Sequence, residues 1–292
     1  MSHDPADDNF ADRLTLERID RDIFTGWCHA GAPLRAFGGQ VAAQALVAAG
    51  TTVDQPDRLV HSLHGYFLRP GRTADHIVYL VDRPRDGRSF STRRVRAVQY
   101  GETIFTMAAS FAVHDDGPEH QAPAPAAPAP ESLPEINLPA GDANSEFSES
   151  GYPEHRLLDL RFVGQDQVTE MSAGRSQRMT WVRTRERLAD DQLTHVCAMT
   201  YFSDLTLVGT ALVPHGGRGA NPELMLASID HAMWFHGPFR ADDWLLFDQD
   251  SPVARGGHGL ARGSFYTADG TLVASVVQEV LMRIKTVRPG EA

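Results

Sequence analysis

The chain has 292 residues, 42% of them hydrophobic, and a formal net charge of −11. This is enough apolar material for one large or two modest cores, and the acidic balance argues against a general nucleic-acid-binding surface. Only two cysteines occur, Cys28 and Cys197, and they form no C-x-x-C pair, which argues against a zinc ribbon, an iron–sulfur site or a disulfide framework.

The ends of the sequence carry no recognisable targeting signal. The first 12 residues are polar and acidic, and no run of about 18 apolar residues occurs anywhere. The last five residues lack a peroxisomal Ser-Lys-Leu signal. We therefore expect a cytoplasmic protein that binds no nucleic acid and makes no stable membrane insertion.

The first 114 residues predict one helix followed by four strands. The helix is rich in small residues, and Pro, Gly and Asp turns separate the strands. The helix is expected at 39–49, and the strands at 61–69, 77–82, 90–99 and 103–113.

A change of composition follows these strands. Between residues 115 and 139, proline recurs at 118, 123, 125, 128, 130, 134 and 139. Proline cannot donate a backbone hydrogen bond, so this segment predicts an extended, semi-rigid linker. We assign 1–114 to an N-terminal repeat, 115–150 to a Pro/Ala-rich linker and 151–292 to a C-terminal repeat.

The second half repeats the order of the first. A helix is expected at 190–207, and strands at 229–235, 244–249, 259–267 and 271–283. Local features also recur, because residues 66–70 resemble 234–238 at a separation of about 168 positions. The pattern predicts an α+β fold made of two tandem units, each a long helix against an antiparallel sheet, with the sheets joined edge to edge or facing each other.

An acidic residue lies on the apolar stripe of the second helix. Asp204 falls seven residues after Cys197 and three after Tyr201, so it points toward the core. A buried Asp must be hydrogen-bonded, neutralised or used in chemistry, because desolvating its charge is costly. The alternative is a solvated Asp204 at the helix edge, or one that caps the next turn.

A second polar residue interrupts an apolar strand face. Gln278 shares one face of the last strand with Leu272, Ala274, Val276 and Val280. Its amide can orient a water or hold a carboxylate, and the alternative is a hydrogen-bonded buried glutamine without a catalytic role.

A serine nucleophile is a weaker interpretation. Ser228, Asp230 and His231 suggest a triad, but Ser228 and His231 point to opposite faces of a regular strand. The chain also lacks the G-x-S-x-G turn of many serine hydrolases.

Several motifs, taken in order, resemble the acyl-CoA thioesterase II family of double-hotdog enzymes. The resemblance runs from about residue 16 to residue 283. It is carried by FGGQV at 37–41, HSLHGYFLRPG at 61–71, RDGRSF at 85–90, SDL at 203–205, SIDHAMWFH at 228–236 and VQE at 277–279.

The resemblance implies hydrolysis of fatty acyl-CoA to free fatty acid and CoA, without a metal or redox cofactor. The family uses an Asp, a Thr and a Gln of the second repeat to hold the hydrolytic water, and the matching positions are Asp204, Ser228 and Gln278. Serine in place of threonine keeps the hydroxyl and loses a methyl group. A homo-oligomer, dimer or tetramer, is also implied, as is a role in CoA phosphate binding for the arginines between residues 83 and 96.

Two other functions remain open at this point. A hotdog enoyl-CoA hydratase would use an Asp and His pair. Asp230 and His231 are adjacent on a predicted strand, so their side chains point to opposite faces and would not converge on one atom. A non-catalytic acyl-CoA-binding module is favoured only by the serine at 228, while a carboxylate at 204 gives such a module no advantage.

Overall fold

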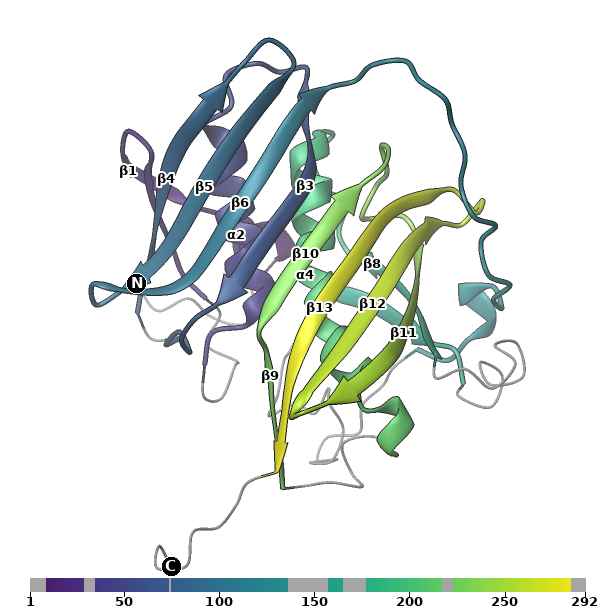
Figure 1. Ribbon diagram of the computed structural model, residues 1–292. Coiled ribbons are helices and arrows are strands. Elements are labelled where there is room, and N and C mark those ends of the chain that lie inside the picture. The colour runs from purple at the N-terminus through teal and green to yellow at the C-terminus, as the bar shows by residue number, and fades with distance from the viewer. Residues whose placement is uncertain are drawn as a thin grey trace, which may run out of the picture.

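The computed structural model describes residues 9–28, 35–73, 75–135, 157–164, 177–216 and 223–284. In this part of the chain, a 13-stranded antiparallel sheet forms one wall of the molecule, and helices α2 (Gly38–Thr51) and α4 (Gln192–Thr210) lie behind it (Figure 1). The strand order is β1-β2-β4-β5-β6-β3-β10-β13-β12-β11-β8-β7, with β9 paired to β13.

The first repeat follows the predicted order and adds short elements before it. The added elements are α1 (Phe10–Leu14), β1 (Glu17–Asp20) and β2 (Ile23–Gly26). Their four- and five-residue lengths give too little periodicity to detect from the sequence. The predicted strands are β3 (Arg58–Phe67), β4 (Ile77–Asp86), β5 (Phe90–Gln99) and β6 (Glu102–Val113).

The second repeat has the same core order with three strands that were not predicted. These are β7 (Leu158–Phe162), β8 (Gln177–Thr184) and β9 (Leu224–Ser228). The predicted strands are β10 (Asp230–Phe235), β11 (Leu245–Arg255), β12 (His258–Thr267) and β13 (Leu272–Ile284). Two 3₁₀ turns, η2 (Pro130–Ser132) and η4 (Val213–His215), complete the described elements.

The two repeats join where β3 pairs with β10. His64 lies opposite Ala232, and Leu63 lies opposite Met233. The sheets therefore meet edge to edge, which was one of the two predicted arrangements, and each protects an edge of the other.

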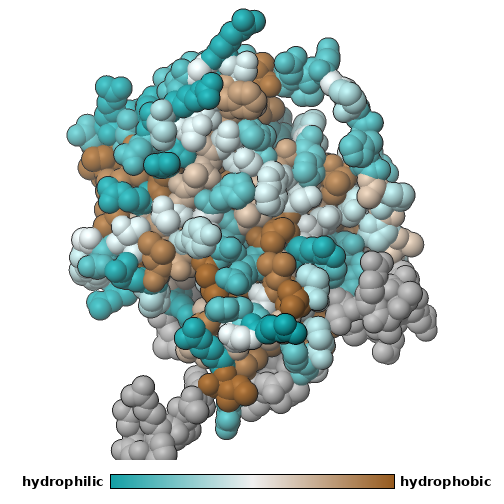
Figure 2. Space-filling view, in the orientation of Figure 1, coloured by the Kyte–Doolittle hydropathy of each residue, from teal (hydrophilic) through white to brown (hydrophobic). Residues whose placement is uncertain are grey.

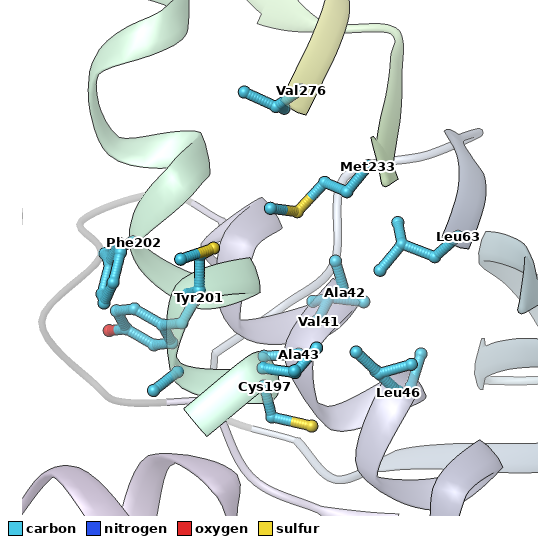
Figure 3. Packing of buried hydrophobic residues seen from close by; sticks show 14 of the residues in the cluster. Val41, Ala42, Ala43, Leu46, Leu63, Cys197, Tyr201, Phe202, Met233 and Val276 are labelled. Carbon is cyan, nitrogen blue, oxygen red and sulfur yellow. The ribbon is translucent and has the colours of Figure 1, made fainter. Parts of the chain in front are cut away.

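The core lies between this sheet and the two helices. Leu63 and Met233 point from their strands toward α2, whose Ala42 and Ala43 leave room for α4 (Figure 3). Helix α4 with its following turn is long and apolar enough to cross a membrane by length and composition alone, but 83% of its most apolar 18-residue stretch is buried inside the protein. Its apolar character on all sides is accounted for by this enclosed position.

The described part of the linker, residues 115–135, crosses the outer face of the second repeat. Gln121 accepts a hydrogen bond from the Leu272 amide, and the Trp181 indole donates to the Pro128 carbonyl over 2.9 Å. Ala124, Ala127 and Leu133 pack on a small apolar cluster of Val163, Met179, Trp181, Leu246 and Tyr266. The predicted boundary at 150–151 lies outside the described residues.

The outer face of the sheet is shown in Figure 2. Hydrophilic residues cover most of this face, and hydrophobic residues form separate small patches. Scattered patches of this kind are normal on a protein surface.

Candidate active site

Helix α4 carries Asp204 into the protein interior. The helix begins after Asp191, whose side chain accepts a hydrogen bond from the Thr194 amide over 3.0 Å. From there it crosses the core, and Asp204 is buried in its second half. The prediction that Asp204 points inward is confirmed, and a solvated position at the helix edge is excluded.

Ser228 and Gln278 both reach this carboxylate. Ser228 Oγ donates to Asp204 Oδ1 over 3.0 Å, and Gln278 Nε2 donates to the same oxygen over 2.6 Å. Gln278 is completely buried. The structure therefore brings together the three side chains that the sequence singled out, from a helix and two strands.

The strand face of Gln278 agrees with the predicted alternation, with one exception. Ala274, Val276 and Val280 share the core face with Gln278, as expected. Leu272 does not, because the register of β12 and β13 shifts between Phe265 and Tyr266. It packs instead with the apolar cluster beneath the linker.

The start of α2 closes the other side of the carboxylate. The Gly39 amide donates a hydrogen bond to Asp204. A Cβ atom at Gly38 would lie 2.6 Å from Asp204 Oδ2, and one at Gly39 would collide with the Tyr201 carbonyl. The two glycines allow this close approach, a role that the sequence motif at 37–41 did not reveal because it depends on contacts with the other repeat.

The environment of Asp204 adjusts its acidity. Burial raises the pKa of its carboxyl from 3.8 to about 6, and the hydrogen bonds from Gln278, Ser228 and Gly39 oppose this shift. Asp204 is therefore mostly ionised at neutral pH and can accept a proton.

A β-bulge turns Ser228 and His231 toward the same side. Ser228 pairs with Val280, and Ala232 pairs with Val277. Between these two pairs the chain advances four residues on one side and three on β13, so one extra residue is inserted. The prediction that Ser228 and His231 point to opposite faces is therefore wrong. Ser228 contacts Asp204 and His231 contacts Ser203, the neighbouring residue of α4.

The remaining candidate residues do not form a second reactive group. The Asp230 carboxylate accepts a hydrogen bond from the Glu279 amide over 2.6 Å, so Asp230 and His231 are directed to different partners and do not form a hydratase pair. Both cysteines are buried, and burial raises the pKa of the Cys28 thiol to about 12. Such thiols are poor nucleophiles at neutral pH.

The arginine-rich segment is partly committed to internal contacts. Arg83 pairs with Asp22 over 2.6 Å, and the fully buried Arg93 pairs with Asp86 and donates to Thr52. These two arginines support the first repeat and are not available to hold the phosphates of CoA.

Comparisons with known proteins identify the family and agree with the fold. Residues 24–112 match the acyl-CoA thioesterase N-terminal domain family, and residues 158–281 match the acyl-CoA thioesterase family. The chain is 37% identical to human acyl-coenzyme A thioesterase 8 over 93% of its length and 88% of that protein.

Solved structures give the same result. The crystal structure of acyl-CoA thioesterase II TesB2 from Mycobacterium marinum is 45% identical, with a TM-score of 0.81, 94% of this chain covered and 98% of that chain. A protein with a hotdog fold from Alicyclobacillus acidocaldarius has a TM-score of 0.77 at 20% identity, covering 95% and 98% of the two chains, which supports the fold alone.

These findings define the class as double-hotdog thioester hydrolases. Within that class, the chain belongs to the acyl-CoA thioesterase II family, so both the predicted family and the predicted fold are confirmed.

Proposed function

We propose that this protein hydrolyses fatty acyl-CoA thioesters with a water molecule activated by Asp204 and oriented by Ser228 and Gln278. One observation carries the proposal. A buried carboxylate, with its pKa raised to about 6, is held by hydrogen bonds from both other side chains at 3.0 and 2.6 Å. A general base with a pKa near the working pH is effective in proton transfer.

In the proposed reaction, Asp204 removes a proton from the water as its oxygen attacks the thioester carbonyl carbon. The carbon–sulfur bond of the tetrahedral intermediate then breaks as Asp204 returns the proton to the departing CoA sulfur, and the products are the fatty acid and CoA. Ser228 and Gln278 restrict the water to a productive direction, which lowers the entropic part of the barrier. Backbone N–H groups in the first turn of α2 provide positive potential beside the carboxylate and the developing oxyanion.

The two halves of the chain have different tasks in this proposal. The second repeat supplies the three polar side chains, and the first supplies the start of α2 at Gly38 and Gly39. Neither repeat alone contains this arrangement, so the site depends on the packing of α2 against α4.

The test is release of free CoA thiol from short, medium and long acyl-CoAs by the wild type and by Asp204→Asn. We expect turnover by the wild type and a loss of roughly 100- to 10,000-fold in the variant, the range for removal of a general base. Acyl-CoA binding by the variant, measured by calorimetry, should persist. Binding without turnover by the wild type would instead indicate an acyl-CoA-binding module.

Two further expectations concern the protein in the cell. We propose a cytoplasmic location and a homo-oligomer, either a dimer or a tetramer. Fractionation and sedimentation velocity test these two proposals independently of the reaction.

A further inference from the structure

The first repeat contains an apolar counterpart of the active-site bulge. In β3, Val60 pairs with Phe111 and Ser62 with Ser110, so one extra residue is again inserted at the corresponding place. Leu63 then faces the core opposite Ala109. Around this bulge of the first repeat, three core positions are therefore occupied by Val60, Leu63 and Ala109.

In the second repeat, those three positions are Ser228, His231 and Gln278. All three are polar, while their counterparts are all apolar. Two of them already hydrogen-bond to Asp204, and the third, His231, is buried with 1% of its surface exposed. The internal comparison therefore groups His231 with the site and not with the apolar core.

The contacts of Ser203 indicate which ring nitrogen of His231 carries the proton. Ser203 Oγ lies 2.8 Å from His231 Nε2 and 2.9 Å from the Thr200 carbonyl oxygen. We assign the single hydroxyl proton of Ser203 to Thr200, whose carbonyl can only accept. In this assignment the ring donates from Nε2, which leaves Nδ1 as an acceptor. Burial lowers the pKa of His231 to about 4, in agreement with a neutral ring.

Two buried polar atoms without a hydrogen-bond partner in the described part of the chain belong to neighbouring residues of β10 and β13. Gln278 donates its amide N–H to the Asp204 carboxylate, which fixes its Oε1 as an acceptor. Among the described residues, neither Gln278 Oε1 nor His231 Nδ1 has a hydrogen-bond partner. Ala232 pairs with Val277, so the next core-facing residues, His231 and Gln278, lie opposite each other, as Leu63 and Ala109 do in the first repeat. One water molecule has the two protons that these acceptors require.

We propose that His231 is a positioning residue of the active site. Its Nε2–H ties Ser203, and with it the helical turn that carries Asp204, to β10. Its Nδ1 and Gln278 Oε1 together bind one buried water molecule, which keeps the Gln278 N–H directed at Asp204. This inference rests on the proposed thioesterase function and adds a fourth polar side chain to it.

The test compares variants that separate the two contacts. His231→Leu introduces the residue of the first repeat and removes both. His231→Asn keeps an acceptor near the position of Nδ1 but is too short to reach Ser203, and Ser203→Ala removes only the contact with the helix. His195→Leu is the matched control, because His195 is also a buried histidine of the second repeat but lies at the start of α4, about two and a half turns from Asp204.

For His231→Leu we expect kcat to fall roughly 10- to 100-fold with KM changed less than about twofold, since a small displacement of a reacting group has effects of this size. The acid limb of kcat/KM should also move to higher pH, because a Gln278 amide that no longer donates to Asp204 leaves the carboxyl pKa higher. His231→Asn should have the same acid limb as the wild type. Ser203→Ala should lower kcat without moving the acid limb. Thermal unfolding shows whether each variant is folded.

Two results would overturn the inference. One is a folded His231→Leu variant with wild-type kcat and an unchanged acid limb. The other is an equal loss of kcat in His195→Leu, which would show a general effect of removing a buried histidine. If the wild type itself does not release CoA, the proposed function fails first, and the two failures are therefore distinguishable.

Discussion

Gln278 donates a hydrogen bond from Nε2 to Asp204 Oδ1 over 2.6 Å and so joins β13 to α4 across 74 residues of sequence. The bond acts against burial, because an N–H donor favours the ionised carboxylate whereas desolvation favours the neutral one. The acidity of the proposed base is therefore a balance between burial and a contact between two elements that are far apart in the sequence.

Replacing Gln278 by glutamate tests this balance. Gln278→Glu places a second carboxylate beside Asp204, and repulsion between two adjacent carboxylates raises the pKa at which the pair loses its last proton. We expect the acid limb of kcat/KM, near pH 6 in the wild type, to move upward by at least about one pH unit. Gln249→Glu is the matched control, since Gln249 is also buried on the sheet but contacts Thr206 and Thr210. An equal movement of the limb in the control would contradict the prediction.

The raised pKa of Asp204 also predicts a pH-dependent change in stability. A carboxyl whose pKa rises from 3.8 to about 6 on folding stabilises the fold while it is protonated, and this contribution is lost as pH rises through 6. Asp204→Asn is neutral at every pH, so it should be more stable than the wild type near pH 8, by at most about 3 kcal/mol. Part of this gain is offset because the asparagine side chain loses an acceptor for the Gly39 amide.

Urea unfolding of both proteins near pH 8 and near pH 4 measures this difference. The advantage of Asp204→Asn should shrink toward zero at the lower pH, where most of the wild-type carboxyl is protonated in the folded state. A constant difference at the two pH values would show that the effect is one of packing and not of charge.

The close approach of α2 to Asp204 predicts a sensitive glycine. In Gly38→Ala, the new methyl group would lie 2.6 Å from Asp204 Oδ2 and 3.0 Å from the Phe67 ring. The carboxylate must shift, and we expect kcat to fall roughly 10- to 100-fold with the fold retained. Gly50→Ala, at the other end of the same helix, would have the flexible Leu193 side chain as its nearest neighbour and should keep its activity. Steady-state kinetics of the two variants provide the comparison.

The linker predicts a stability effect that is separate from catalysis. The buried Trp181 indole donates to the Pro128 carbonyl, and Trp181→Phe removes that bond from the surface where the linker packs. We expect a loss of about 1 kcal/mol in the free energy of unfolding and faster hydrogen exchange around Pro128, with kcat unchanged. Trp27 is a half-exposed tryptophan of the first repeat. Trp27→Phe should change neither the free energy of unfolding nor the hydrogen exchange around Pro128.

Much of the framework could be predicted because strand and helix periods are local properties. The strand predicted at 90–99 is β5 itself, and the helix predicted at 190–207 overlaps most of α4. Asp204 was detectable because a carboxylate interrupts an apolar stripe. Strand alternation also singles out Gln278 but by itself favours a structural role for it, and only the family resemblance joins Gln278 and Ser228 to Asp204.

The β-bulge could not be predicted, and it accounts for the error at His231. Alternation along a strand has a period of two, so one inserted residue reverses the face of every residue after it. The insertion is visible only in the pairing of Ser228 with Val280 and Ala232 with Val277. The same limit applies to Gly38, whose need for a small side chain arises from a residue of the other repeat.

The hydroxyl of Ser228 is predicted to be essential, and its missing methyl group is not. Ser228→Thr keeps the donor to Asp204 Oδ1 and narrows the choice of rotamer, so kcat should be equal or higher. Ser228→Ala removes the donor, so the pKa of Asp204 should rise and the acid limb of kcat/KM should move to higher pH. The value of kcat should fall to roughly one tenth of the wild-type value or below. Profiles of kcat/KM against pH for the three proteins measure both effects. A folded Ser228→Thr variant with a large loss of activity would show that the hydroxyl is oriented in a way that the threonine methyl group does not permit.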